Sequence, residues 1–312
     1  MRLITYYQQG GLPRIGVRVG HRVLDIEAAS RVDGEPLPGT MKTLLREGRG
    51  ALSRVQALAK AAQTNAGRFS GAMVEERAIR FLPPVPDADK FLCVGKNYRS
   101  HLEELKRNDL IKEMPEEPTG FIKLNSSLVG HNAKVAKPDG IPHLDYEPEL
   151  VFVIGRRALG VGKEDAMDYA VGVTVLNDLT DRDMQKREVA SGSRFWTSKN
   201  APGFGPLGPE IVTMDEILDP YDLWMTCSVN GEERMRVNTR EQIWKLPDII
   251  EHFSRTIPIE PGDMFSTGAP GGVAAGKPNA QDLYLKVGDV VECSIEGITT
   301  LRTTIVAPGA AQ

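Results

Sequence analysis

The chain has 312 residues, of which 41% are hydrophobic and 26% are charged, and its formal net charge is -4. This composition is ordinary for a globular protein with a substantial core, and the length suits one large domain or one large and one small domain. The mildly acidic charge and the lack of long basic runs argue against binding to nucleic acid or to an anionic membrane, so small-molecule chemistry is the better expectation.

The first 82 residues predict a small α+β domain. Strand-like alternation covers residues 2–7, 15–19 and 22–26, and helical patterns cover residues 40–45 and 51–62. The segment Pro83-Pro84-Val85-Pro86-Asp87 is a stiff connector that can continue neither a helix nor a central strand. We therefore expect a first domain of residues 1–82 and a second domain of residues 88–308.

The second domain is predicted to be mainly β, because strand-like runs alternate with Gly, Pro and Asp turns. The expected strands are residues 90–95, 150–154, 170–176, 223–229, 264–267, 290–295 and 301–306. The expected helices are residues 97–112, 180–190 and 246–255. The overall fold class is thus mainly β, of the α+β kind.

The chain begins without the apolar segment of a signal peptide, and no stretch is long enough to span a bilayer, which predicts a cytoplasmic protein. Cys93, Cys227 and Cys293 lie far apart in apolar segments. They are interpreted as core residues rather than as parts of a disulfide framework or a zinc cluster.

Two glycine-rich stretches have the spacing of phosphate-binding motifs. Gly203 to Gly208 has that of the dinucleotide fingerprint, but Pro206 would stop the helix that this motif opens. Residues 271–277 have that of a phosphate-binding loop, but Pro278 stands where a hydroxyl residue would hold Mg²⁺. We expect loops at both places and no bound nucleotide.

Three acidic residues indicate a metal site. Glu147 and Glu149 are two residues apart where an apolar strand begins, so their side chains point to the same face. Asp178 follows the apolar run of residues 170–176, where it can converge with them. Three hard oxygen ligands without nearby His or Cys favour Mg²⁺, Mn²⁺ or Ca²⁺ over Zn²⁺. The alternative is a solvated strand face followed by a common Asn-Asp turn.

Other polar residues would suit an enzyme built on such a metal. His101 and Glu104 are three residues apart on a predicted helix, so the carboxylate can orient the imidazole and raise its basicity. Arg182, Gln185 and Lys199 follow Asp178 and would suit an anionic substrate. The alternatives are an ordinary helical pair and surface ion pairs.

Taken together, a series of unlike segments resembles the fumarylacetoacetate hydrolase family over residues 88–308. These segments are Gly95-Lys96-Asn97-Tyr98 with His101, Phe121-Ile122-Lys123, Asp145-Tyr146-Glu147-Pro148-Glu149-Leu150, Asn177-Asp178, Arg182-Asp183-Met184-Gln185, Lys199, Val229-Asn230-Gly231-Glu232, Pro261-Gly262-Asp263 and Thr267-Gly268. Residues 1–82 look like the short N-terminal extension of many bacterial members. Two positions depart from the family's pattern: Pro148, and Ala269 where the family usually has Thr.

The resemblance implies the family's mixed β-roll or β-sandwich and a homodimer. The metal ligands would be Glu147, Glu149 and Asp178, holding Mg²⁺ or Mn²⁺. The catalytic residues would be His101 with Glu104, which activate water, and Lys199, which neutralises developing negative charge. The substrate-binding residues would be Arg182, Gln185, Lys123 and Thr267. We expect residues 98–119, a polar segment containing Pro115 and Pro118, to form a lid over the metal.

The implied activity is hydrolysis of a carbon–carbon bond in a 2,4-dioxo acid of the acylpyruvate or fumarylpyruvate type, giving pyruvate and a carboxylic acid. One alternative is decarboxylation of oxaloacetate, and another is isomerisation of an unsaturated diacid such as 2-hydroxyhepta-2,4-diene-1,7-dioate, which would place the protein in aromatic catabolism. A different class of alternative is a non-catalytic dimer whose acids serve structure. The presence of acids, dyad and cation together favours an enzyme.

Overall fold

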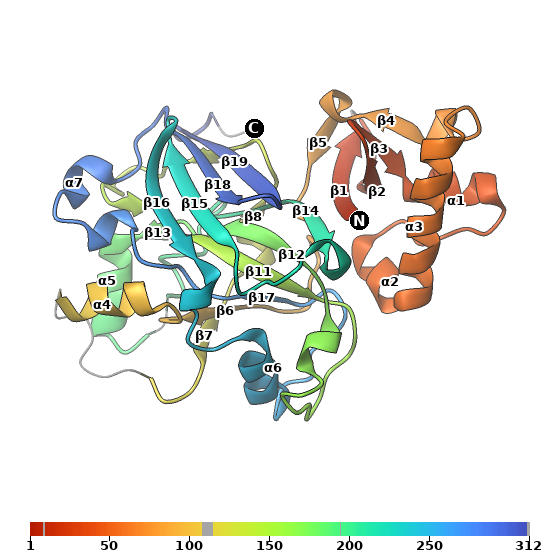
Figure 1. The fold of residues 1–312 in the computed structure, drawn as a ribbon. Coiled ribbons are helices and arrows are strands. Elements are labelled where there is room, and N and C mark those ends of the chain that lie inside the picture. Colours follow the sequence, from red (N-terminus) through yellow and green to blue (C-terminus); the bar gives the residue numbers. More distant parts are fainter. Residues whose placement is uncertain (9, 108–114, 194, 311–312) are drawn as a thin grey trace.

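The structure is a computed structural model that describes residues 1–8, 10–107, 115–193 and 195–310. Most of the described strands belong to one large mixed sheet and one smaller sheet, with few helices around them (Figure 1). The expected mainly β fold with mixed sheets is therefore confirmed. None of the described helices is long and apolar enough to cross a membrane.

The large sheet runs through both predicted domains. Its strands in spatial order are β4 (Met73–Glu75), β3 (Arg22–Asp25), β2 (Arg14–Val19), β1 (Arg2–Gln8), β14 (Gly205–Thr213), β12 (Ala170–Asn177), β11 (Pro148–Ile154), β17 (Met264–Ser266), β6 (Phe91–Gly95) and β7 (Thr119–Ile122), with β5 (Ile79–Phe81) beside β1 and β8 (Leu128–Val129) beside β14. β1 pairs antiparallel with β14, and this pairing joins the N-terminal strands to the second domain.

A five-stranded sheet packs against the large one and consists of β16 (Glu232–Asn238), β15 (Trp224–Val229), β18 (Val290–Ile295), β19 (Thr299–Val306) and β9 (Ala133–Ala136). A two-stranded sheet joins β10 (Leu144–Asp145) to β13 (Thr180–Asp181). The apolar core between the large and the five-stranded sheet includes Phe152, Val175 and Leu301.

The helices lie at the periphery of the sheets. They are α1 (Ile26–Asp33), α2 (Met41–Arg46), α3 (Arg49–Thr64), α4 (Arg99–Arg107), α5 (Arg182–Ala190), α6 (Leu246–Ser254) and α7 (Ala280–Leu283). Short 3-10 helices are η1 (Ser70–Ala72), η2 (Glu76–Ala78), η3 (Asn125–Ser127), η4 (Ala166–Tyr169), η5 (Met214–Glu216), η6 (Thr239–Glu241) and η7 (Ala274–Gly276). Figure 1 shows α1, α2 and α3 on one side of the molecule and α4, α5 and α7 on the opposite side.

A second apolar core connects the N-terminal helices to the large sheet. It contains Val55 and Leu58 of α3 together with Phe91, Val151 and Leu207 of the second domain. Because this core runs across the connector at residues 83–87, the division into residues 1–82 and 88–308 stays a prediction.

One prediction about the fold was wrong. Gly205–Thr213, expected to begin as a loop, form β14 in the middle of the large sheet. Pro209 is tolerated because the register between β12 and β14 shifts beside it, and because β1 joins β14 only at Ile211 and Val212, beyond both prolines. A segment that contains two prolines can therefore form a central strand, because its pairing with the neighbouring strands is irregular.

The N-terminal unit has a buried polar contact of its own at Asp25. The Asp25 carboxylate accepts hydrogen bonds from the hydroxyl of Tyr6 at 2.6 Å, from Nη2 of Arg14 at 2.9 Å and from the backbone amide of Ala28 at 2.8 Å. The last bond caps α1. Burial raises the pKa of Asp25, but the bonds from Arg14, Tyr6 and Ala28 outweigh it and hold the pKa below its usual 3.8.

Replacing Asp25 should therefore weaken the fold in a pH-dependent way. Asp25→Ala should lower the free energy of unfolding by about 3 kcal/mol at pH 7, because a cap and charge-assisted bonds are lost. Since the folded pKa lies below the unfolded value, this contribution is full above pH 3.8 and fades as the pH falls further. Urea unfolding across this range measures it. Asp33→Ala, which removes an exposed ion pair with Arg68, is the control, and an Asp25 effect that does not shrink with acid would contradict the account.

Candidate functional site

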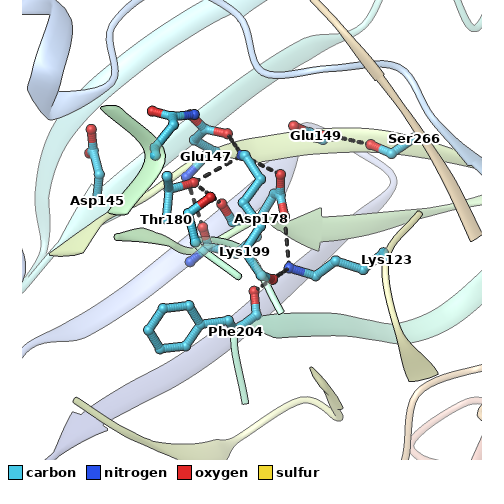
Figure 2. A network of polar contacts seen from close by, with 12 residues as sticks. Lys123, Asp145, Glu147, Glu149, Asp178, Thr180, Lys199, Phe204 and Ser266 are labelled. Carbon is cyan, nitrogen blue, oxygen red and sulfur yellow. Dashed lines mark hydrogen bonds and ion pairs between the residues drawn. The ribbon is translucent and has the colours of Figure 1, made fainter. Parts of the chain in front are cut away.

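Three carboxylates meet where β11 begins and β12 ends. The two strands pair antiparallel with Pro148 opposite Asn177, so Glu147 precedes one strand beside Asp178, which follows the other. The backbone amide of Asp178 donates to the carbonyl of Glu147 at 2.8 Å, which ties the two segments together. Glu149 points to the same face, and one oxygen from each acid lies within 4.8 Å of the other two (Figure 2).

Lys199 neutralises two of these acids. Its ammonium contacts Glu147 Oε2 and Asp178 Oδ2 and donates to Thr180 Oγ1 at 2.9 Å. Burial lowers the pKa of Lys199, but the neighbouring carboxylates raise it overall, so the side chain stays charged. The structure thus places this predicted catalytic lysine directly among the predicted metal ligands.

Lys123 lies behind Asp178. Its fully buried ammonium donates to Asp178 Oδ1 at 2.7 Å and to the carbonyl of Phe204 at 2.8 Å, and it also donates to the carbonyl of Lys199. These bonds use all three N–H hydrogens. A Cβ on Gly205 would meet Lys123 Cε at 2.8 Å, so this glycine leaves room for the lysine. We propose that Lys123 orients Asp178 rather than contacting the substrate.

Arg182 begins α5 and reaches back toward the acids. Its Nε donates to Asp145 Oδ2 at 2.8 Å, and its Nη2 lies 2.6 Å from Glu147 Oε1. Nη1 donates to Gln185 Oε1 at 2.9 Å, so these two predicted substrate residues form one group. Asp145 was not assigned a role from the sequence, although it stands in the same segment as Glu147.

Thr267 lies just after β17 and is fully buried. Its hydroxyl donates to the carbonyl of Leu150 at 3.0 Å and accepts from Gln242 Nε2 at 3.2 Å. The side chain therefore braces the strand that carries Glu149. Its predicted contact with the substrate stays a prediction.

The electrostatics of the acids are uneven. Burial raises the pKa of Glu147, but Arg182, Lys199 and His101 lower it more, to about 2. Burial, with the charges of Asp178 and Glu147, raises the pKa of Glu149 well above its usual range. Among the described residues no cation pairs with Glu149, and its hydrogen bond comes from Ser266.

This arrangement fits a divalent cation. Three buried carboxylates of hard oxygen character converge, and one of them lacks the positive charge that would balance it. Glu147, Glu149 and Asp178 could each supply one oxygen. Oxygen ligands alone suit Mg²⁺ and Mn²⁺ equally.

The predicted histidine–carboxylate dyad lies on α4. His101 Nδ1 is 3.5 Å from Glu104 Oε2, and neither atom has a hydrogen-bond partner among the described residues. Glu104 Oε1 accepts from the backbone amide of Gly272 at 2.8 Å, which fixes the carboxylate. A small approach of the imidazole would close the pair, as is common for catalytic bonds in unliganded enzymes. The predicted lid runs through residues 108–114, which lie outside the described residues, so it stays a prediction.

Residues 90–306 match the sequence model described as fumarylacetoacetate (FAA) hydrolase C-terminal. The mitochondrial oxaloacetate tautomerase fahd2 of Xenopus laevis is 33% identical over 309 residues, which cover 98% of this chain and 90% of that protein. The oxaloacetate tautomerase YisK of Bacillus subtilis is 32% identical over 288 residues, which cover 91% of this chain and 93% of that protein.

Solved structures of similar fold include enzymes with different reactions. The fumarylacetoacetate hydrolase of Exiguobacterium antarcticum has a TM-score of 0.76 at 30% identity and covers 98% of this chain and 100% of its own. A 5-carboxymethyl-2-hydroxymuconate delta-isomerase from Mycobacterium smegmatis has a TM-score of 0.71 at 27% identity, with 98% and 100% coverage. The maleylpyruvate hydrolase of Sphingobium sp. SYK-6, in complex with manganese(II) and pyruvate, has a TM-score of 0.74 at 26% identity, with 98% and 99% coverage.

Glu149→Gln should separate metal binding from folding. The amide keeps the shape and can still accept from Ser266, but it cannot ionise to bind a cation. Affinity for Mn²⁺ should fall by roughly 100-fold or more, because loss of residues that merely support a ligand already costs about 10–100-fold. Metal-free protein should unfold at the same or a higher temperature. Calorimetric titration and thermal unfolding in chelator measure the two effects, with the exposed Glu232→Gln as control. Unchanged affinity would contradict the assignment.

Lys123→Met tests whether this lysine serves Asp178. The variant leaves a buried carboxylate oxygen and two carbonyls without a donor, so the free energy of unfolding should fall by about 3–5 kcal/mol. Mn²⁺ affinity should fall by about 10–100-fold, because Asp178 loses its support. Titration of the folded variant is the measurement, and Lys163→Met, which breaks a half-exposed pair with Asp248, is the control. Normal Mn²⁺ affinity with weakened substrate binding would favour the substrate role instead.

Proposed function

The chain belongs to the fumarylacetoacetate hydrolase family, and on this basis we propose that it is a divalent-metal-dependent enzyme that interconverts the keto and enol forms of a 2-oxo diacid such as oxaloacetate. The observation that carries the proposal is the acid triad beside Arg182 and the His101–Glu104 pair. The sequence favoured hydrolysis, with decarboxylation of oxaloacetate or isomerisation of an unsaturated diacid as alternatives. Two relatives that align with more than nine tenths of the chain are named oxaloacetate tautomerases, which supports a keto–enol isomerisation instead.

The residues at the site suit a dicarboxylate. Arg182 presents a planar guanidinium, and a cation bound by Glu147 and Asp178 would release the Lys199 ammonium from these acids toward a substrate. Both side chains are buried, where charge-assisted bonds are stronger than in water. A divalent ion held by Glu147, Glu149 and Asp178 would polarise the 2-oxo group and stabilise negative charge on its oxygen. The charged groups on this face thus favour a negatively charged dicarboxylate over an uncharged substrate.

His101 supplies the proton transfer. When Nδ1 donates to Glu104, the lone pair of Nε2 is left free to act as the base. Nε2 takes the proton from carbon 3 of the keto form and delivers it to the oxygen on carbon 2, so a C–H bond breaks and an O–H bond forms. The reverse transfer returns the keto form. Neither direction consumes water or a second substrate.

Hydrolysis of an acylpyruvate-type acid is the second candidate, because the same dyad can activate water. Water that loses its proton to His101 would attack the second carbonyl, and the carbon–carbon bond would then break to give a carboxylic acid and, after protonation of carbon 3, pyruvate. A maleylpyruvate hydrolase among the structural neighbours favours this candidate. We further propose that the protein is a cytoplasmic homodimer.

The proposed reaction predicts a specific loss in His101→Ala. With Mg²⁺ present, the wild type should speed the exchange of the carbon 3 protons of oxaloacetate with D₂O, followed by NMR, and chelator should abolish this. His101→Ala should lower kcat by about 10²–10⁴-fold, which is the usual contribution of a positioned general acid or base to the rate. Its Mn²⁺ affinity should be unchanged. The exposed His21→Ala is the control.

The same spectra distinguish the second candidate. Metal-dependent release of acetate and pyruvate from acetylpyruvate, without accelerated proton exchange of oxaloacetate, would show that the enzyme is a hydrolase and not a tautomerase. Full exchange activity in His101→Ala would show that another group moves the proton.

A further inference from the structure

Asp145 is a fully buried carboxylate whose bonding capacity is used within the protein. Oδ1 accepts from the backbone amides of Tyr146 and Ala274, each at 2.9 Å. Oδ2 accepts from the amide of Ala275 at 2.9 Å and from Nε of Arg182 at 2.8 Å. Every partner is a donor, and Asp145 is outside the triad that could hold a metal. The side chain therefore serves other protein groups.

The amides of Ala274 and Ala275 belong to the loop of residues 271–276. This loop also contacts Glu104, the carboxylate of the His101–Glu104 pair. On its other side, Gly272 donates its amide to Glu104, and a Cβ on Gly276 would lie 2.5 Å from the Glu104 carboxylate. The loop thus approaches α4 so closely that a side chain at position 276 would displace the Glu104 carboxylate. A shift of η7 would move Glu104, and with it the partner of His101.

The bond to Arg182 leads to the other half of the site. With Nε held by Asp145, the guanidinium plane is fixed and Nη2 stays 2.6 Å from Glu147 Oε1. One carboxylate therefore holds both the arginine beside the triad and the loop beneath the dyad. These two groups come from segments about ninety residues apart in the sequence.

We propose that Asp145 is a positioning residue that sets the distance between the acid triad and the His101–Glu104 pair. The proposal rests on the function proposed above, in which a proton passes between His101 and a substrate held at the triad. Such a transfer needs the base within hydrogen-bond reach of the reacting atom, and a misplacement of about 1 Å costs on the order of 10²-fold in rate.

Asp145→Asn tests the proposal with the smallest change in shape. All partners of the carboxylate donate, so the new NH₂ group must face an N–H donor in either orientation. We expect kcat to fall by about 100-fold, by more than KM rises, with Mn²⁺ affinity changed by less than about threefold. Backbone hydrogen exchange should rise in residues 99–107 and 271–276. Asp183→Asn, next to Arg182 but half-exposed and paired with His143, is the matched control and should change none of these.

Gly276→Ala disturbs the contact between the same loop and Glu104. It keeps the proposal testable if Asp145→Asn does not fold. It should also lower kcat and raise exchange in α4. Because both variants act through one loop, the double variant should lose less than the product of the two single losses. Unchanged exchange in both segments, or a fully multiplicative double variant, would overturn the proposal. A loss of Mn²⁺ affinity as large as the loss of kcat would also overturn it, since Asp145 would then act through the ligands.

The exchange readout separates this proposal from the proposed function. If the wild type does not act on oxaloacetate but Asp145→Asn still loosens residues 99–107 and 271–276, the structural role of Asp145 stands and the substrate assignment fails. If the wild type is active and the variant changes neither exchange nor kcat, the substrate assignment stands and the role of Asp145 fails.

Discussion

The burial of four carboxylates at the joined ends of β10, β11 and β12 is the constraint on which the rest of the site depends. Ionised groups in a protein interior are costly unless each is paired and hydrogen-bonded. Asp145 and Glu147 are balanced by Arg182, and Asp178 by Lys123 and Lys199, whereas Glu149 has no cationic partner among the described residues. The four carboxylates therefore face one cationic side chain fewer than would balance them. This missing positive charge is what a bound cation would supply.

The fold connects distant parts of the chain to this cluster. β14 begins beside Lys123, because the carbonyl of Phe204 accepts from its ammonium and Gly205 leaves space for it. Farther along, β14 pairs with β1 and so carries the whole N-terminal unit. The N-terminal strands and helices thus support a central strand, whereas the candidate site residues all lie outside this unit.

The sequence revealed the groups whose placement follows from local geometry. Glu147 and Glu149 share a face because a strand has a period of two, and His101 and Glu104 share a helical face. It did not reveal what Lys123 contacts, since two of its acceptors are carbonyls 76 and 81 residues away. Asp145 escaped notice for the same reason, as its loop partners lie 129 and 130 residues further on. Pro206 and Pro209 also hid β14, whose pairing with β12 is irregular beside Pro209.

The most direct test of the central claim is anomalous diffraction from crystals grown with Mn²⁺. We expect one strong manganese peak among Glu147, Glu149 and Asp178, with an oxygen of each acid as ligand and the Lys199 ammonium moved away from at least one carboxylate. Lys123 should keep its bond to Asp178. Absence of a peak at saturating Mn²⁺, or a peak elsewhere with Lys199 still bridging Glu147 and Asp178, would contradict the claim that this cluster is a divalent cation site.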